Sequence, residues 1–293
     1  MRRLVRRVQR LVIGPGPILD VRGFVDLSRE VYPLAGQEPL PARSDLEERV
    51  RAGTAIRGNC PVCGKPHLFQ RFTENLRDSG RCSGCGSSNR NRQLASFLRR
   101  RLGLPALGSI VLPETTRLYN AEANGPLHRA LRHAPGYVCS EYFGPDVAGG
   151  SHVDGIRHED LQRLSFPNES FDVVLTSDVL EHMPDPYAAH REIFRTLKRG
   201  GRHLFTVPFA VGAAADDQRA RMEGGKTVYL KEKLWHVDPI RPDEGVLVWT
   251  IFGMEMLTRL ERIGFVARMW ILYEPRHGII GPENTVFEAL RPN

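Results

Sequence analysis

The 293-residue sequence lacks any apolar run long enough to cross a bilayer as a helix. Its amino-terminal stretch is basic, and the apolar residues there are too few and too interrupted by Arg to match a secretory signal. Hydrophobic residues make up 41% and charged residues 26%, which is typical of an ordinary soluble protein. We therefore expect a cytoplasmic protein with enough chain for one large domain or two unequal ones.

Acidic residues are scarce in two amino-terminal stretches, residues 1–10 and 58–103, whereas residues 11–57 are nearly balanced. Residues 1–10 contain five Arg and no acid, and residues 58–103 contain nine basic residues against two acidic ones. Residues 104–293 are mildly acidic, with 21 basic residues against 25 acidic ones. Any nucleic-acid surface is therefore expected in the basic amino-terminal third. Two interpretations of residues 1–16 stay open. They form either a basic tail that is frayed or docked on the body, or a segment that contacts anionic lipid or nucleic acid.

Cysteines are few, and four of the five form a pattern. Cys60-x2-Cys63 and Cys82-x2-Cys85 are separated by 18 residues, and Gly follows the second Cys of each pair. This spacing predicts a structural zinc site, because protein thiolates would fill all four tetrahedral positions. The alternatives are disulfides, which a cytoplasmic chain disfavours, or four free thiols. Cys139 lies in an apolar strand pattern and is expected in the core.

An Arg-rich helix is predicted directly after the second cysteine pair, with Ser87 or Ser88 as its cap. Apolar side chains recur along one face, and most of the arginines lie elsewhere. Two interpretations stay open: a phosphate-binding surface, or a packed module with a solvated basic face. The arginines in question are Arg90, Arg92, Arg99, Arg100 and Arg101.

The stretch Phe171–Asp185 reads as a buried strand that ends abruptly in a polar loop. Its apolar residues are rich in β-branched types, which is typical of a strand covered on both faces. Ligands bind at the carboxyl ends of strands in parallel α/β sheets. We therefore expect Ser177, Asp178 and His182 to lie at a site.

The segments "FDVVLTSDVLEHMPDP" and "HREIFRTLKRGGRHLFTVPF" resemble the S-adenosylmethionine-dependent methyltransferases of the Rossmann-like class. The resemblance is clearest over residues 158–208. It implies an α/β fold with a seven-stranded, mostly parallel sheet and helices on both faces, including a third strand somewhere before Asp160. The expected organisation is a basic segment and linker (1–57), a zinc-knuckle module with its Arg-rich helix (58–104) and a methyltransferase domain (110–293). The module also resembles the zinc-bearing part of some bacterial methyltransferases.

The resemblance assigns residues to S-adenosylmethionine, although the usual glycine-rich loop keeps only Glu122 and Gly125. Glu141 would accept hydrogen bonds from the ribose hydroxyls, and its alternative is a solvent-exposed strand end. Asp160 would accept the adenine amino proton, with the Leu161 backbone facing the ring. Ser177 and Asp178 would line the sulfonium region, and Asp178 could also cap the following turn. The assigned positions are Glu122, Gly125, Glu141, Asp160, Leu161, Ser177 and Asp178.

Residues 210–250 form an insertion after the fifth strand, where such enzymes often build the acceptor pocket. His236 is the candidate base that takes a proton from a hydroxyl, and Asp238 would orient it. The alternative is that His236 only packs in a lid. His182 is a pocket or turn residue by one interpretation and a general base by another.

These features together predict an S-adenosylmethionine-dependent methyltransferase with a structural zinc ion. A small-molecule or glycan acceptor, methylated on oxygen, is favoured by the acidic domain, the aromatic-rich insertion and the lack of an Asn/Asp-Pro-Pro-Tyr signature. One alternative is an RNA methyltransferase that binds nucleic acid through the zinc module. Another is a non-catalytic binding protein that has lost the glycine loop.

Overall fold

The computed structural model describes most of the chain after residue 44, together with two short amino-terminal strands. Asp238 and the basic residues 1–16 lie outside the described residues, so the predictions made for them are not addressed by the structure. No helix in the described part is both long enough and apolar enough to cross a membrane. The described residues are 18–20, 29–31, 45–236, 245–282 and 284–293.

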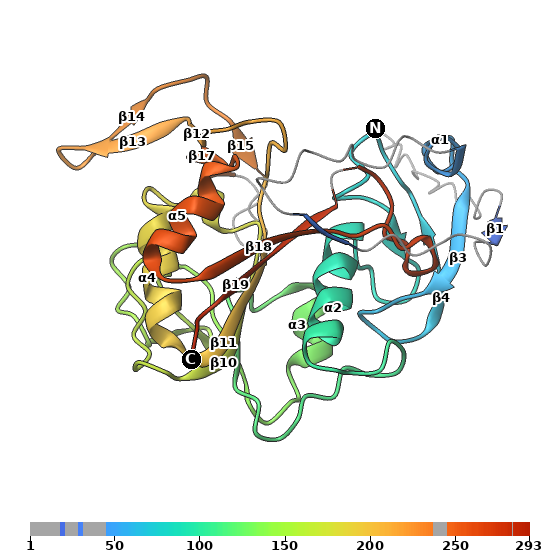
Figure 1. Cartoon of the computed structure of the whole chain (residues 1–293), viewed down its shortest axis with the longest axis horizontal. Coiled ribbons are helices and arrows are strands. Elements are labelled where there is room, and N and C mark those ends of the chain that lie inside the picture. Colours follow the sequence, from blue (N-terminus) through green and yellow to red (C-terminus); the bar gives the residue numbers. More distant parts are fainter. Residues whose placement is uncertain (1–17, 21–28, 32–44, 237–244, 283) are drawn as a thin grey trace, which may run out of the picture.

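A seven-stranded mixed sheet forms the centre of the molecule (Figure 1), with the strand order β2-β18-β19-β11-β10-β6-β7. The pairs β6–β7, β6–β10 and β10–β11 are parallel, whereas β11–β19, β18–β19 and β2–β18 are antiparallel. The prediction of a mostly parallel sheet therefore holds for one half of it. The strands are β2 (Arg29–Val31), β6 (Leu118–Asn120), β7 (Tyr137–Cys139), β10 (Phe171–Ser177), β11 (Leu197–Thr206), β18 (Val266–Ile271) and β19 (Thr285–Leu290).

Helices cover both faces of this sheet, as predicted. In Figure 1, α2 (Asn89–Arg101) and α3 (Gly125–Leu131) lie on one side, and α4 (Pro186–Thr196) and α5 (Glu255–Ile263) lie on the other. The buried strand β10 supplies side chains to both cores, because alternate residues of a strand face opposite sides. A continuous apolar strand is therefore required at the centre of the sheet.

A third strand was predicted before Asp160. This prediction is wrong, because the central sheet has no strand from that segment. Only a single parallel bridge, between Glu141 and His158, remains beside β7. The intervening chain forms a small hairpin of β8 (His152–Val153) and β9 (Ile156–Arg157). This segment is rich in Gly and contains Pro, which weaken strand pairing. The seventh strand is instead β2, from the amino-terminal part of the chain.

The cysteine-bearing module has its own four-stranded sheet, in the order β1-β3-β4-β5. The strand β3 begins before residue 58, so the predicted boundary there cuts through a strand, and the domain division stays a prediction. Phe69 of the module, Leu94 of α2 and Leu118 of β6 belong to one hydrophobic cluster, so the module and the central sheet share a core. The elements are β1 (Ile18–Asp20), α1 (Asp45–Arg51), β3 (Ala55–Asn59), β4 (Pro66–Gln70) and β5 (Arg81–Cys82).

The first turns of α2 are fastened to the end of the chain. Asn89 Nδ2 donates to Ile280 O (2.6 Å), and Gln93 Nε2 donates to Asn284 Oδ1 (2.6 Å). Arg92 is completely buried and donates to Ser87 O and Gly278 O. Each of these three side chains thus has at least one hydrogen bond to a residue far away in sequence.

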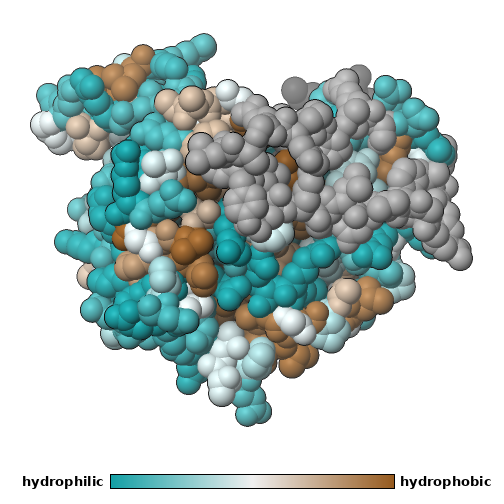
Figure 2. Space-filling view, viewed as in Figure 1, coloured by the Kyte–Doolittle hydropathy of each residue, from teal (hydrophilic) through white to brown (hydrophobic). Residues whose placement is uncertain are grey.

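The insertion forms short antiparallel strand pairs, of which β13–β14 projects from the body in Figure 1. The projecting pair carries polar and apolar side chains side by side (Figure 2), including exposed Met222 and Tyr229. The remaining short elements are η1 (Leu180–His182), β12 (Asp217–Gln218), β13 (Ala220–Glu223), β14 (Lys226–Tyr229), β15 (Trp235–His236), β16 (Val246–Leu247), β17 (Thr250–Ile251) and η2 (Pro275–His277).

Candidate active site at the carboxyl ends of the central strands

The predicted site residues lie where neighbouring parallel strands end. Asn120 of β6 pairs with Leu175 of β10, and Ser177 of β10 pairs with Thr206 of β11. The loops that follow these strands therefore leave the sheet along one edge. In parallel sheets this edge is the usual place for ligands.

The loop after β6 brings Glu122 and Gly125 together. Asn124 is the N-cap of α3 and accepts from Gly125 N at 2.7 Å. Gly125 has a φ of +79°, and a Cβ at this position would lie 2.1 Å from Glu122 Oε1. The backbone conformation therefore favours glycine, and a side chain here would also displace the Glu122 carboxylate. Burial raises the pKa of Glu122 to about 7, an effect that Arg90 opposes and Glu141 strengthens.

Glu141 follows β7 and contacts the same loop. Its Oε1 accepts a hydrogen bond from Ala123 N at 2.8 Å. Glu122 and Glu141, which the sequence assigned to one cofactor, therefore lie at neighbouring loops. The Glu141 carboxylate also fixes the loop that carries Glu122.

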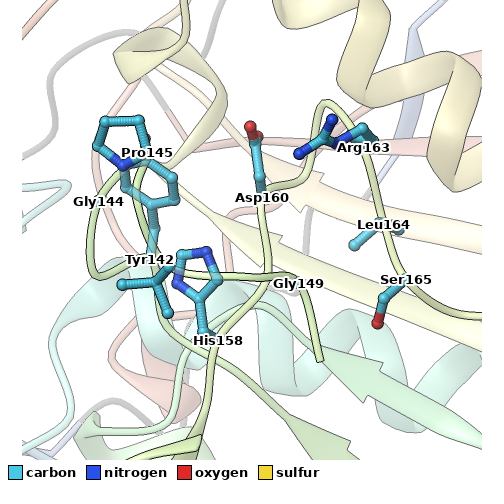
Figure 3. A pocket seen from close by; sticks show the side chains of 10 residues that line it. Tyr142, Gly144, Pro145, Gly149, His158, Asp160, Arg163, Leu164 and Ser165 are labelled. Carbon is cyan, nitrogen blue, oxygen red and sulfur yellow. The ribbon is translucent and has the colours of Figure 1, made fainter. Parts of the chain in front are cut away.

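A cavity of about 240 Å³ opens beside Glu141 (Figure 3). Tyr142 and His158 line one side, and Asp160 lies across from them. His158 Nδ1 accepts from Phe143 N (3.0 Å), so the neutral ring carries its proton on Nε2. Asp160 Oδ1 accepts from Gln162 N (2.9 Å). The Leu161 side chain is buried in the core, which leaves only its backbone for a ligand.

Asp178 is bound by an arginine of the cysteine module. Arg77 donates to both carboxylate oxygens, with distances of 2.6 and 2.7 Å, and Thr206 Oγ1 adds a third hydrogen bond at 2.9 Å. Although burial opposes it, the charges of Arg77 and Arg90 hold the pKa of Asp178 well below its usual range. Asp178 also has a left-handed backbone, with φ +52°. Its carboxylate is thus engaged within the protein, and contact with a cofactor stays a prediction.

Arg90, in the first turn of α2, reaches the same strand end. Its Nη1 donates to Ser177 O (3.1 Å) and Ser177 Oγ (3.2 Å), and its Nε donates to Asp78 (2.7 Å). It also lies 3.2 Å from Asp178. The sequence identified Arg90 only as part of a basic helix and did not single out Arg77. Neither residue has a local signal that points to partners about 90 to 100 positions away.

Glu181, His182 and His236 form a cluster next to these ion pairs. Glu181 Oε1 lies 3.6 Å from His182 Nε2 and 3.8 Å from His236 Nδ1. Glu181 is completely buried, and burial together with the Asp178 charge raises its pKa well above the usual range. His182 Nδ1 lies 2.9 Å from Leu247 O, to which it donates. The sequence analysis proposed both histidines as site residues but did not propose Glu181. A glutamate in a loop is common in any soluble protein, so its residue type alone does not indicate a site.

The four cysteines meet as the spacing predicted. Their sulfur atoms all lie within 4.8 Å of one another, and those of Cys60 and Cys85 are 3.7 Å apart. Gly64 N donates to Cys60 O and Gly86 N donates to Cys82 O, so the two knuckles have matching turns. Four thiols at these separations suit one tetrahedral ion such as Zn²⁺.

The arginines of α2 are engaged inside the protein. Arg99 is buried and donates to Pro61 O, Pro105 O and Gly108 O. Arg100 pairs with Glu274, and Arg101 pairs with Glu288 while lying over Trp270. Together with the contacts of Arg90 and Arg92, these interactions favour the interpretation of α2 as part of a packed module. None of them supplies a phosphate-binding surface.

Comparison with known proteins relates the centre of the chain to methyltransferases. Residues 140–205 match a family described as a methyltransferase domain. The 27-O-demethylrifamycin SV methyltransferase of Amycolatopsis mediterranei (strain S699) is 40% identical over 75 residues, which cover 24% of this chain and 27% of that protein. An uncharacterized methyltransferase of Mycobacterium marinum is 25% identical over 162 residues, covering 48% and 63% of the two chains. The chain thus matches less than two thirds of the length of either relative.

Solved methyltransferase structures are also similar. An S-adenosylmethionine-dependent methyltransferase from Mesorhizobium loti has a TM-score of 0.39 and 18% identity, and the match covers 67% of this chain and 97% of that one. The 1,6-didemethyltoxoflavin-N1-methyltransferase of Burkholderia thailandensis has a TM-score of 0.42 and 15% identity, with 70% and 79% coverage.

Proposed function

We propose that this chain is an S-adenosylmethionine-dependent methyltransferase that transfers a methyl group to a hydroxyl of a small molecule or glycan. The observation that carries the proposal is the convergence of Glu122, Glu141 and Ser177 at the carboxyl ends of three adjacent strands. The name of the Amycolatopsis relative describes O-methylation of a small molecule, which agrees with this acceptor class.

The protein's part in methyl transfer is to bind, to align and to handle one proton. S-adenosylmethionine, when bound, supplies an electrophilic methyl group. Glu141 would hold the ribose hydroxyls, and Asp160 in the cavity of Figure 3 would accept from the adenine amino group. Alignment of acceptor and methyl group lowers the barrier without covalent help from the enzyme.

The histidine cluster is the proposed site of proton transfer. His236 lies on the insertion, and His182 lies in the turn after β10. Burial lowers the pKa of His236, which keeps its ring neutral and able to accept a proton at neutral pH. Asp238 was expected to orient His236, but it lies outside the described residues. Within the described part of the chain, the carboxyl group of Glu181 would take this role. It lies beside both rings, and because burial and the Asp178 charge raise its pKa, it would act in the neutral form and orient the rings without adding a negative charge.

The cysteine module is proposed to hold a structural Zn²⁺. All four ligand positions would be protein thiolates, which leaves none for a substrate. The ion would fix the loop that carries Arg77 and the helix that carries Arg90.

Calorimetry with S-adenosylhomocysteine, followed by a labelled-methyl transfer assay on candidate sugars and polyketide-like alcohols, tests the proposal. We expect binding by the wild type, weaker binding by Asp160→Ala, and transfer of label to an oxygen atom. Absence of binding in the folded, zinc-loaded protein would overturn the enzymatic function. Transfer of label to RNA but to no hydroxyl compound would favour the RNA alternative.

A further inference from the structure

The turn after β10 and the insertion bring three side chains that can bind metal to one point. Glu181 and His182 belong to η1, and His236 belongs to β15. One ligand atom from each residue lies within 4.8 Å of those of the other two. Glu181 Oε1 is 3.6 Å from His182 Nε2 and 3.8 Å from His236 Nδ1. Two ligand atoms that share a tetrahedral zinc ion, each about 2.0–2.1 Å from it, lie about 3.4 Å apart, so these separations suit a common ion.

Glu181 is a buried carboxyl group for which the described residues provide no hydrogen-bond donor. Its side chain is completely buried, and in this part of the chain neither carboxylate oxygen has a hydrogen-bond partner. A polar group buried in this way costs free energy unless something else binds it. The two imidazoles lie farther from it than a direct hydrogen bond allows, which is the spacing expected when a cation lies between the groups.

The backbone near the cluster holds the three side chains in place. His182 Nδ1 donates to Leu247 O (2.9 Å), so the lone pair of the neutral ring is on Nε2, the nitrogen that is near Glu181. Histidines that bind metal usually donate their other ring N–H in this manner. Trp249 N donates to Glu181 O (2.7 Å), and β15 pairs with β16. The insertion is therefore fastened to the turn that carries two of the three residues.

The charges around the cluster are compatible with a cation. The positive charges of Arg77 and Arg90 act on Glu181. However, Arg77 pairs with Asp178 at 2.6 Å. Arg90 pairs with Asp78 at 2.7 Å. These four charges cancel, so an ionised Glu181 gives the region one net negative charge.

We propose that Glu181, His182 and His236 bind a divalent transition-metal ion such as Zn²⁺, and that an open position on this ion binds the acceptor hydroxyl. Imidazole suits such ions, whereas Mg²⁺ and Ca²⁺ prefer oxygen ligands. The ion replaces the proton on Glu181, because a carboxyl group binds metal in its ionised form. The His236 side chain is 38% exposed, so water and an acceptor can reach the ion. The role toward the acceptor rests on the proposed function, whereas binding of the ion does not.

The ion would change how the acceptor loses its proton. A hydroxyl bound to a divalent ion is more acidic, so it gives its proton to water more readily. The alkoxide oxygen then forms a bond to the methyl carbon, while the bond between that carbon and the sulfonium sulfur breaks. His236 is a ligand in this state, and its role as a base belongs to the protein without the ion.

Metal analysis tests the site without cofactor or acceptor. Protein with one zinc ion in the cysteine module is dialysed against micromolar free Zn²⁺, and we expect a second ion per chain. Glu181→Gln and His236→Gln should weaken binding of the second ion by more than about 100-fold, since even loss of a residue that only positions a ligand costs about 10- to 100-fold. His133→Gln, which replaces an exposed histidine just after α3, is the matched control and should keep both ions.

Co²⁺ added to the protein with one zinc ion identifies the ligand type. Nitrogen and oxygen ligands should give weak visible absorption bands without the strong near-ultraviolet bands of cobalt bound to thiolates. Thiolate bands would overturn the inference, because they would place the second ion at the cysteines. A wild type that binds only one zinc ion would overturn it too, as would a second ion that both site variants retain.

Methyl transfer separates this inference from the proposed function. With the hydroxyl compound that the labelled-methyl assay identifies, the second zinc ion should raise the rate at least about tenfold. An unchanged rate would overturn the role of the ion toward the acceptor. If protein with two zinc ions failed to bind S-adenosylhomocysteine, the proposed function would fail and the metal site would stand.

Discussion

At the scale of single residues, the site is dominated by side chains whose charge is set by their surroundings. Asp178 is held ionised by two arginines, whereas Glu181 and Glu122, both close by, are driven toward the neutral form by burial. Carboxyl groups with such different pKa values inside one site are typical of functional centres.

The pKa of Glu122 predicts a pH-dependent affinity for the cofactor product. Its pKa of about 7 means that the carboxylate is largely protonated at pH 6 and largely ionised at pH 8. Glu122 is one of the residues expected to bind the cofactor, and the cofactor product carries an ammonium group. If Glu122 lies near that group, only its ionised form attracts it, so affinity for S-adenosylhomocysteine should rise from pH 6 to pH 8 and then level off. Titration calorimetry across this range measures the slope. Glu122→Gln should flatten it, and an unchanged slope in that variant would assign the titration to another group.

His236 is expected to matter for the rate and not for cofactor binding. His236→Gln should lower kcat by about 10²-fold or more, because it removes a general base, while S-adenosylhomocysteine binds as in the wild type. Steady-state kinetics with the identified acceptor, together with calorimetry, separates the two effects. His133→Gln, which replaces an exposed histidine just after α3, is the control. Full activity of His236→Gln would return His236 to the role of a packing residue.

At the scale of secondary-structure elements, the sequence predicted those that carry a local signal. The strand β10, the helix α2 and the cysteine knuckles all follow from periodicity, caps and spacing. The prediction of a third strand before Asp160 was wrong because a Gly-rich segment forms a hairpin there. The link between Arg77 and Asp178 spans 101 residues, and no local pattern encodes a contact of that range.

This link between two elements predicts a large stability effect. Arg77→Ala would remove the bidentate partner of the buried Asp178 and leave it only Arg90 and Thr206, at a cost of about 3–5 kcal/mol in the free energy of unfolding. Urea denaturation of the zinc-loaded protein measures the loss. Arg191→Ala breaks an exposed ion pair with Asp185 and should cost less than about 1 kcal/mol. A similar small loss for Arg77→Ala would show that Asp178 is hydrated in solution.

At the scale of the whole molecule, the cysteine module and the central sheet form one body. They share a hydrophobic core, and the module's arginines reach the strand ends where the site lies. The module therefore packs against the candidate active site and shares its core with the central sheet.

Removal of the metal should consequently weaken cofactor binding, although the cysteine cluster itself does not contact the cofactor. Stripping Zn²⁺ with a chelator, or replacing Cys82 by Ser, should weaken S-adenosylhomocysteine binding at least tenfold, because α2 and the Arg77 loop lose their anchor. Metal analysis paired with calorimetry tests this. Cys139→Ser, outside the cluster, should keep its zinc. Metal-free protein that bound the ligand normally would show that the module is dispensable for the site.

The contacts of α2 with residues 278–284 also bear on how the protein is made. During synthesis α2 leaves the ribosome long before Gly278, Ile280 and Asn284, so its buried polar side chains begin without the acceptors they have in the native state. Contacts of such high sequence separation form late and slowly. The cofactor site is therefore completed only when the last strand has been synthesised, and a chain that stops after β18 should depend on chaperones to stay free of aggregates.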